Sequence, residues 1–231
     1  NNVENGKLNI NLDLYFNSNF EVSNFIAKGK AKEVRAVLSK NLFLKDTSFD
    51  FFFDKSDIII KNAETKISGM VLKDGNLFIT RDKDITLKSE FSSEVNLNKE
   101  NLKNYLMFFK DFNFDDNLKN IEGSFNHVLD VKFDKTLKVL DFNYSNKGNI
   151  KNLSYNLDLK KNSFLMEDIK KIELKNSDVN FKLYSDKEYS IEAKGKYKLN
   201  NELPQNFELA NNLSKNTNTL DISLETNQAL N

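Results

Sequence analysis

Residues 8–16 read LNINLDLYF, and apolar side chains occupy every second position from Leu8 to Phe16. Successive side chains of a β-strand point to opposite faces of the sheet, so this pattern predicts a strand with one buried face and one solvated face. One-sided alternation is typical of antiparallel sheets, because parallel sheets are covered on both faces and their strands are apolar throughout.

The same period of two recurs along the rest of the chain. Further alternating runs contain Phe49, Phe51 and Phe53, then Ile85, Leu87 and Phe91, then Phe125, Leu129, Val131 and Phe133, then Val179, Phe181 and Leu183, and finally Leu220, Ile222 and Leu224. Polar segments at 17–19, 73–76, 145–149 and 185–188 have the length of hairpin connections. We therefore expect a mainly β protein, built as a long antiparallel meander that curves into an open groove.

One segment has the spacing of a helix instead. Leu102 and Tyr105 belong to an apolar series with helical intervals, and Asn98 precedes the series as a capping residue. These features predict one short helix at 99–110. The segment 203–213 is a second helical candidate.

The domain organisation follows from these elements. We expect residues 1–231 to form a single elongated β-rich segment of a larger protein, since the chain begins at Asn1 without Met. The helix at 99–110 is the expected seam between an N-terminal sheet over 1–98 and a C-terminal sheet over 111–231.

The composition excludes several classes of partner and site. Lys plus Arg and Asp plus Glu number 34 each, so the chain has no net charge to attract nucleic acid. The absence of Cys removes disulfides, thiol catalysis and Cys-based zinc sites. No stretch approaches the roughly 20 apolar residues of a membrane-spanning helix. We expect no nucleic-acid partner and no cofactor.

The sequence contains no recognisable catalytic motif. It lacks a Gly-x-Ser-x-Gly motif, a phosphate-binding glycine loop and a cluster of metal-ligating histidines. His127 is the only histidine and shares the parity of its apolar neighbours, which favours a structural role over proton transfer. The pairs Asp82 with Asp84 and Asp115 with Asp116 favour solvated charge over an acid/base pair or a calcium site. We expect no enzyme, no catalytic residue and no metal site.

Glycines recur inside strand-like segments. Gly29, Gly69, Gly123 and Gly195 each have the parity of their apolar neighbours, so each would leave space on the apolar face. Sheet curvature or a bulge is one explanation, and room for a ligand is the other.

Three other segments leave two interpretations open. The basic stretch 28–35 favours a solvated strand face over contact with lipid headgroups. The apolar cluster at 49–60 favours core packing over acyl-chain contact. The helix at 99–110 is apolar over more than one stripe, which favours covering a sheet edge or groove end over touching a membrane.

Long alternating strands, glycines embedded in strands, a short helix after a run of strands and the near absence of Pro together resemble the AsmA-like family, which includes TamB and the YhdP-type proteins. The resemblance spans most of residues 7–199, and the segments 49–79 and 189–199 carry most of it. It implies a repeating β-groove in the periplasm of a Gram-negative bacterium. An anchor helix that this sequence does not include would tether the groove to the inner membrane, and phospholipids would move along it to the outer membrane.

The implied partners are phospholipid acyl chains, flanking groove segments of the same chain and the membrane that holds the anchor. Each buried methylene contributes about 0.8 kcal/mol, so exposing an acyl chain of roughly sixteen carbons to water costs on the order of 12 kcal/mol. A continuous apolar trough removes most of that cost. The groove-lining candidates are Phe16, Phe49, Phe51, Phe53, Ile85, Leu87, Phe125, Leu129, Val131, Phe133, Val179, Phe181 and Leu183.

Two other functions compete with lipid transport. One is a structural or adhesive surface protein, a β-sandwich or solenoid whose core is filled by its own side chains. The other is a module that binds a soluble apolar ligand in a closed pocket. An apolar face that stays open favours the groove, and faces that cover each other favour the structural protein.

Overall fold

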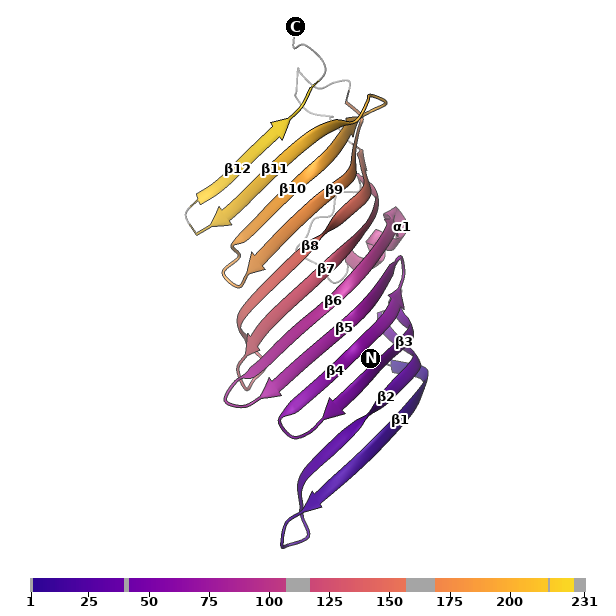
Figure 1. The fold of residues 1–231 in the computed structure, drawn as a ribbon, viewed down its shortest axis with the longest axis vertical. Helices are drawn as coiled ribbons and strands as arrows, with labels where there is room; N and C mark the ends of the chain where they lie inside the picture. Colours follow the sequence, from indigo (N-terminus) through magenta and orange to yellow (C-terminus); the bar gives the residue numbers. More distant parts are fainter. Residues whose placement is uncertain (1, 40–41, 107–116, 157–168, 216, 227–231) are drawn as a thin grey trace. The chain divides into compact units, whose positions relative to one another are not determined.

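The structure is a computed structural model that describes residues 2–39, 42–106, 117–156, 169–215 and 217–226. These residues are almost entirely antiparallel β-structure. One open sheet of twelve strands follows the order of the chain and does not close into a barrel (Figure 1). This confirms the predicted mainly β, antiparallel meander.

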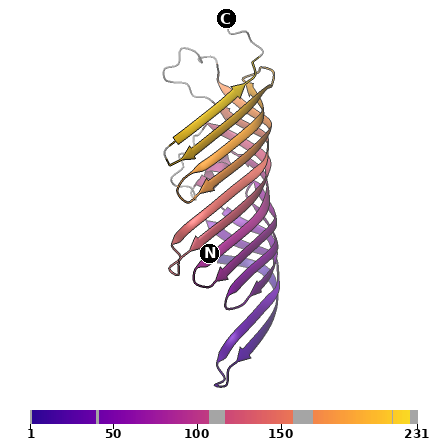
Figure 2. The same ribbon diagram turned by 60° about the vertical axis from the view of Figure 1, so that its left-hand side comes forward.

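The strands are long, and Figure 2 shows that they curve along their length. They are β1 (Asn2–Phe16), β2 (Val22–Ser39), β3 (Leu42–Phe53), β4 (Asp57–Ile67), β5 (Met70–Arg81), β6 (Ile85–Asn98), β7 (Leu118–Phe133), β8 (Val139–Asn156), β9 (Lys171–Tyr184), β10 (Tyr189–Leu199), β11 (Gln205–Ser214) and β12 (Thr217–Leu224).

The one helix of the described residues, α1 (Lys99–Leu106), begins at the predicted position. The Asn98 side-chain oxygen accepts a hydrogen bond from the Asn101 backbone N–H at 2.9 Å, which confirms the predicted cap. The remainder of the helix expected to reach residue 110, and the pair Asp115 and Asp116, lie outside the described residues.

The chain divides into two compact units. The first unit comprises Asn1–Ser93 and Asn126–Ser145, and the second comprises Glu94–Phe125 and Asn146–Asn231. Strands β6, β7 and β8 contribute residues to both units. The seam expected at 99–110 stays a prediction.

Strands β2 to β5 of the first unit each contain a bulge. The bulges coincide with non-glycine residues in the left-handed region, which are Glu33, Asp46, Asn62 and Asp74 with φ of 54°, 52°, 53° and 53°, and the strand register shifts beside each of them. A bulge inserts one extra residue, so the side chains beyond it change parity while the faces of the sheet stay the same.

A similar bulge lies in β9 of the second unit. Asn176 has φ of 46°, and the register with β10 shifts beside it. Leu174 before the bulge and Val179 after it therefore share a face although their parities differ. The bulges keep the apolar residues of a strand together.

Three sequence-based boundaries are wrong. The polar segments 73–76 and 145–149 are not turns but lie inside β5 and β8. The segment 203–213 is not helical, because its residues from Gln205 onward belong to β11, which pairs with both β10 and β12. The β4–β5 hairpin instead turns at Gly69, which has φ of 76° and is therefore not embedded in a strand. The turns expected at 17–19 and 185–188 are confirmed.

Neighbouring residues fill the space at the glycines inside the strands, since an added Cβ would meet the Phe51 ring at Gly29 and Ser177 at Gly195. Gly29 pairs with Phe51, and Gly195 pairs with Phe207. A Cβ added to Gly29 would lie 2.9 Å from Phe51 Cζ and would overlap the backbone oxygen of Asn9. Phe51 and Phe207 are both buried. The space at these glycines is filled by the protein itself, so close packing explains them and room for a ligand does not.

We predict that Gly29→Ala lowers the free energy of unfolding by about 1–3 kcal/mol, because the new methyl group would push against the β1 backbone. Alanine ordinarily stabilises a strand interior relative to glycine by about 0.5–1 kcal/mol, so the sign of the change is diagnostic. Urea denaturation followed by circular dichroism measures it. Lys28→Ala, on the exposed face next to Gly29, is the control and should change stability by less than about 0.5 kcal/mol. A Gly29→Ala protein as stable as the wild type would contradict the packing described.

Candidate functional site

The pairing of the strands places the apolar side chains of the first unit on one face, which we call the apolar face. Residues that lie opposite one another on adjacent antiparallel strands have side chains on the same face. Two rows cross β1 to β5 in this way, and they are Leu12, Ala27, Phe53, Ile58 and Ile79, and Ile10, Gly29, Phe51, Ile60 and Leu77. The Phe51 and Phe53 rings stack with centroids 4.9 Å apart, and Phe49 meets Phe51 edge to face at 6.3 Å.

The second unit has an apolar face of the same kind. Three rows cross β9 to β12, and they are Val179, Ala193, Leu209 and Ile222, then Phe181, Ile191, Asn211 and Leu220, then Leu183, Tyr189, Leu213 and Asn218. Asn211 and Asn218 interrupt the apolar series, so these rows are less uniform than those of the first unit.

The groove-lining candidates of β1, β3 and β9 fall on these faces. Phe16 lies at the end of β1, and Phe49, Phe51 and Phe53 form the aromatic series of β3, while Val179, Phe181 and Leu183 head the three rows of the second unit. The candidates Ile85 and Leu87 in β6, and Phe125, Leu129, Val131 and Phe133 in β7, share the parity of Phe91 and His127, whose rings stack.

Several members of the apolar face were not among the candidates. Ile10, Leu12, Ile60 and Leu77 belong to the rows of the first unit, and Leu209 belongs to those of the second. The alternation in 8–16 already indicated the first two. Ile60 lies in a run of three isoleucines, so alternation does not indicate which of them is on the apolar face. Leu209 lies in the segment that the sequence analysis interpreted as a helical candidate.

A polar cluster joins β6, β7 and β8 in the first unit. Its members occupy positions with the same sequence parity as the apolar side chains of their strands. His127 Nε2 lies 2.8 Å from Ser93 Oγ, and His127 Nδ1 lies 2.8 Å from Tyr144 Oη. The imidazole stacks on the Phe91 ring at 4.4 Å with 12° between the planes. Because both ring nitrogens have hydrogen-bond partners, the contacts support the structural role expected for His127. Burial lowers the pKa of His127 below its ordinary value.

The opposite face, which we call the polar face, carries ion pairs between neighbouring segments. In the first unit Lys30 Nζ lies 3.0 Å from Asp50, and Lys132 Nζ lies 2.8 Å from Asp84. Hydrogen bonds from Asn62 and Lys30 lower the pKa of Asp50, and Asp84 raises the pKa of Lys132. These contacts agree with the interpretation of 28–35 as a solvated strand face and of Asp84 as solvated charge.

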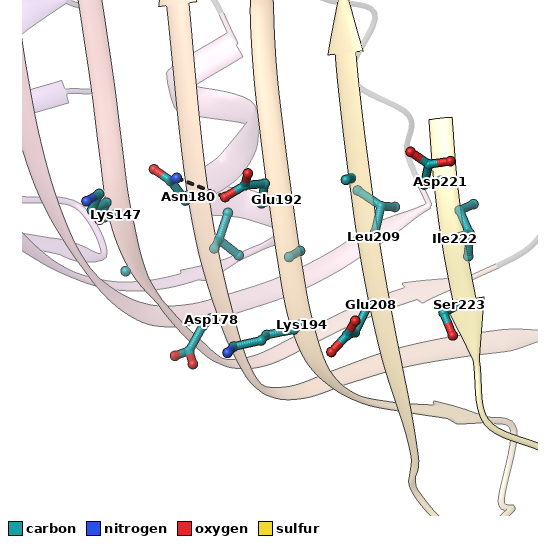
Figure 3. A pocket seen from close by; sticks show the side chains of 14 residues that line it. Lys147, Asp178, Asn180, Glu192, Lys194, Glu208, Leu209, Asp221, Ile222 and Ser223 are labelled. Carbon is teal, nitrogen blue, oxygen red and sulfur yellow. Dashed lines mark hydrogen bonds between the residues drawn. The ribbon is translucent and has the colours of Figure 1, made fainter. Parts of the chain in front are cut away.

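A shallow pocket of about 800 Å³ lies over β8 to β12 of the second unit (Figure 3). Its lining includes two polar-face rows, which are Asp178, Lys194, Glu208 and Ser223, and Asn180, Glu192, Ala210 and Asp221, and also the apolar row Val179, Ala193, Leu209 and Ile222. Asn180 donates a hydrogen bond to Glu192 at 3.1 Å. The charged groups of both signs in this lining suit a solvated surface.

The described residues give no sign of a metal centre or a membrane-spanning helix. Within them, no group of three or more His, Cys, Asp or Glu is arranged to hold a metal ion. Of the helical structure that the described ranges contain, none is long and apolar enough to cross a membrane.

We predict that the stability of the protein falls as the pH decreases from about 7.5 to 5.5. The folded state holds the pKa of His127 below the ordinary value of 6.5, so the unfolded chain binds the proton first. The contribution of His127 is therefore complete above pH 6.5 and is lost as the pH falls through the lower pKa of the folded state. Urea midpoints across this range measure the effect.

The His127 prediction has an internal check, because the chain has a single imidazole. The imidazole proton resonances in an NMR titration of the folded protein should report a midpoint below 6.5. His127→Gln should flatten the pH dependence of the urea midpoint between pH 7.5 and 5.5. A midpoint at or above 6.5 would contradict the buried, neutral imidazole.

Comparisons with known proteins identify no relative of this chain. No protein-family model matches it, no curated protein matches it and no solved structure matches it. The likeness to the AsmA-like family therefore rests on features of the sequence alone.

Proposed function

We propose that the apolar face binds phospholipid acyl chains and forms a segment of a lipid-conducting groove. The observation that supports this proposal is the open sheet, whose apolar side chains form continuous rows across neighbouring strands. The described strands form one sheet, so they supply no second sheet to cover these rows.

The exposure of the rows is compatible with lipid contact. Phe53, Ile58 and Phe181 are only partly buried, so each retains apolar surface that an acyl chain would cover. Covering apolar surface stabilises the complex by about 25 cal/mol per Å². Contacts of this kind have no directional requirement, so a chain can shift along a row without breaking specific bonds. Movement of lipid along the face requires no catalytic residue.

The AsmA-like resemblance supplies the finer part of the proposal. The groove would lie in the periplasm of a Gram-negative bacterium and conduct phospholipids between the inner and outer membranes. Its partners would be the acyl chains, flanking groove segments of the same chain and the inner membrane, through an anchor that this sequence does not include. Neither nucleic acid nor a cofactor has a part in this role.

A structural or adhesive role is the second candidate function. The observation that favours it is the filling of the space at Gly29 by Phe51 and at Gly195 by Ser177, since these residues cover part of the apolar face with the protein's own side chains. A face covered entirely in this way would be dry and would carry no lipid.

We predict that the protein purified from a bacterial host carries phospholipid, and that Phe181→Asp removes most of it. Asp at this position places a charge against the acyl chain, where no partner compensates its loss of hydration. Ser190→Asp is the matched control, because Ser190 lies one strand away on the polar face, opposite Lys182. Native mass spectrometry and lipid extraction should show a several-fold loss of phospholipid in Phe181→Asp and wild-type amounts in Ser190→Asp.

Urea denaturation of both variants separates loss of lipid from loss of fold. The comparison is valid if Phe181→Asp retains a cooperative transition and the wild-type circular dichroism spectrum. A lipid-free wild-type protein would overturn the groove and leave the structural role. Equal loss of lipid in both variants would show that binding does not use the apolar face.

A further inference from the structure

Residues 134–140, which we call the β7–β8 tip, carry uncovered apolar side chains. Leu137, Val139 and Leu140 are 67%, 48% and 51% exposed, and every residue from 135 to 141 is exposed. Strands β7 and β8 lie in the interior of the sheet, between β6 and β9 (Figure 1). A strand added at either edge of the sheet, beside β1 or β12, would therefore leave this tip uncovered.

Leu137 also holds a backbone conformation that large side chains disfavour. Its φ is 66°, and its N–H donates to the backbone oxygen of Asp134 at 3.0 Å, so the turn ends with a residue in the left-handed region. Gly and Asn are favoured at such a position, because a Cβ crowds the carbonyl oxygen that follows it. A residue that is both strained and apolar in water lowers stability twice, and outliers of this kind cluster at functional sites.

The β9–β10 turn has the same geometry without an apolar side chain. Lys187 has φ of 68°, and its N–H donates to the backbone oxygen of Tyr184 at 3.0 Å. The Lys187 side chain is exposed, as a solvated charge should be. The turn therefore does not require an apolar residue in the left-handed position, and Leu137 needs an explanation of its own.

The β7–β8 tip pairs most of its backbone donors internally. The Asp134 carboxylate accepts hydrogen bonds from the N–H groups of Thr136 and Lys138 at 2.8 and 3.0 Å, and the N–H of Asp134 donates to the backbone oxygen of Lys138 at 3.0 Å. Unpaired backbone groups are costly to bring into an apolar medium, whereas paired groups have already exchanged their bonds to water. The tip can therefore leave water at a lower cost than an open loop can.

We propose that the β7–β8 tip inserts Leu137 and its apolar neighbours into the surface of a lipid bilayer. Three side chains on one turn offer much less area than the roughly 800 Å² per partner of a typical protein interface. A bilayer takes up single apolar side chains and requires no complementary shape. Lys135 and Lys138 stay at the level of the headgroups, where they favour anionic lipid. The docking requires no lipid on the apolar face, so it does not depend on the proposed function.

Co-sedimentation of the 231-residue chain with vesicles of phosphatidylcholine and phosphatidylglycerol tests the docking. Leu137→Asn should weaken binding about tenfold, because it removes the apolar side chain that is inserted. The same change should raise the urea midpoint, since Asn tolerates the left-handed conformation better than Leu. This combination separates a docking residue from a structural one, whose replacement would lower the midpoint.

Lys187→Asn is the matched control, because it makes the same replacement in a turn of the same geometry. It should raise the urea midpoint and leave vesicle binding unchanged. A wild-type protein that stays in the supernatant would overturn the proposal, and so would Leu137→Asn that binds as the wild type does or an equal loss in both variants. Leu137→Asn should keep the wild-type amount of co-purified phospholipid, so failure of the docking and failure of the groove are distinguishable.

A single tryptophan reports insertion directly, because the chain has no Trp of its own. The emission of Leu137→Trp should shift to shorter wavelength when vesicles are added and should be quenched by brominated lipid, whereas Lys187→Trp should show neither change. Both positions are exposed, so the variants should fold. An emission spectrum of Leu137→Trp that vesicles leave unchanged would overturn the proposal.

Discussion

The register between neighbouring strands is the constraint on which the rest of the structure depends. Side chains alternate faces at every residue, so a slip of one position would turn an apolar row onto the polar face. The bulge at Asp46 shows how the chain meets this constraint, since Leu44 and Thr47 pair with residues of the same face of β2 although their parities differ. Matching bulges in the adjacent strands keep the rows continuous where each strand changes parity.

A sheet of this kind must bury apolar surface within a single layer. It does so in part by laying an aromatic ring over the glycine of a neighbouring strand, as Phe51 does at Gly29. The ring covers backbone that a glycine would otherwise expose, and the missing Cβ lets the ring approach closely. Phe51 is only 6% exposed as a result. The same packing that stabilises the sheet removes the most buried rings from contact with a ligand.

Alternation sufficed to predict the strands around 8–16, 49–53 and 179–183, because their apolar residues keep one parity for several turns of the pleat. It failed at 73–76, because Asp74 and its neighbours form a bulge with the composition of a turn. The turn predicted at 145–149 in β8 was wrong for another reason, since strand pairing there overrides local propensity. The hydrogen bonds of His127 to Ser93 and Tyr144 span 34 and 17 residues, so no local pattern contains them.

The exposure of each candidate decides how much it could contribute to binding lipid. Phe51 and Val131 are 6% and 9% exposed, so they have little apolar surface left to cover. Phe16 at 56% has much more, and so does Ile222 at 55%, a residue of the apolar rows that was not among the candidates; both lie on edge strands. Any stabilisation by an acyl chain must therefore come from the partly buried interior residues and the edges.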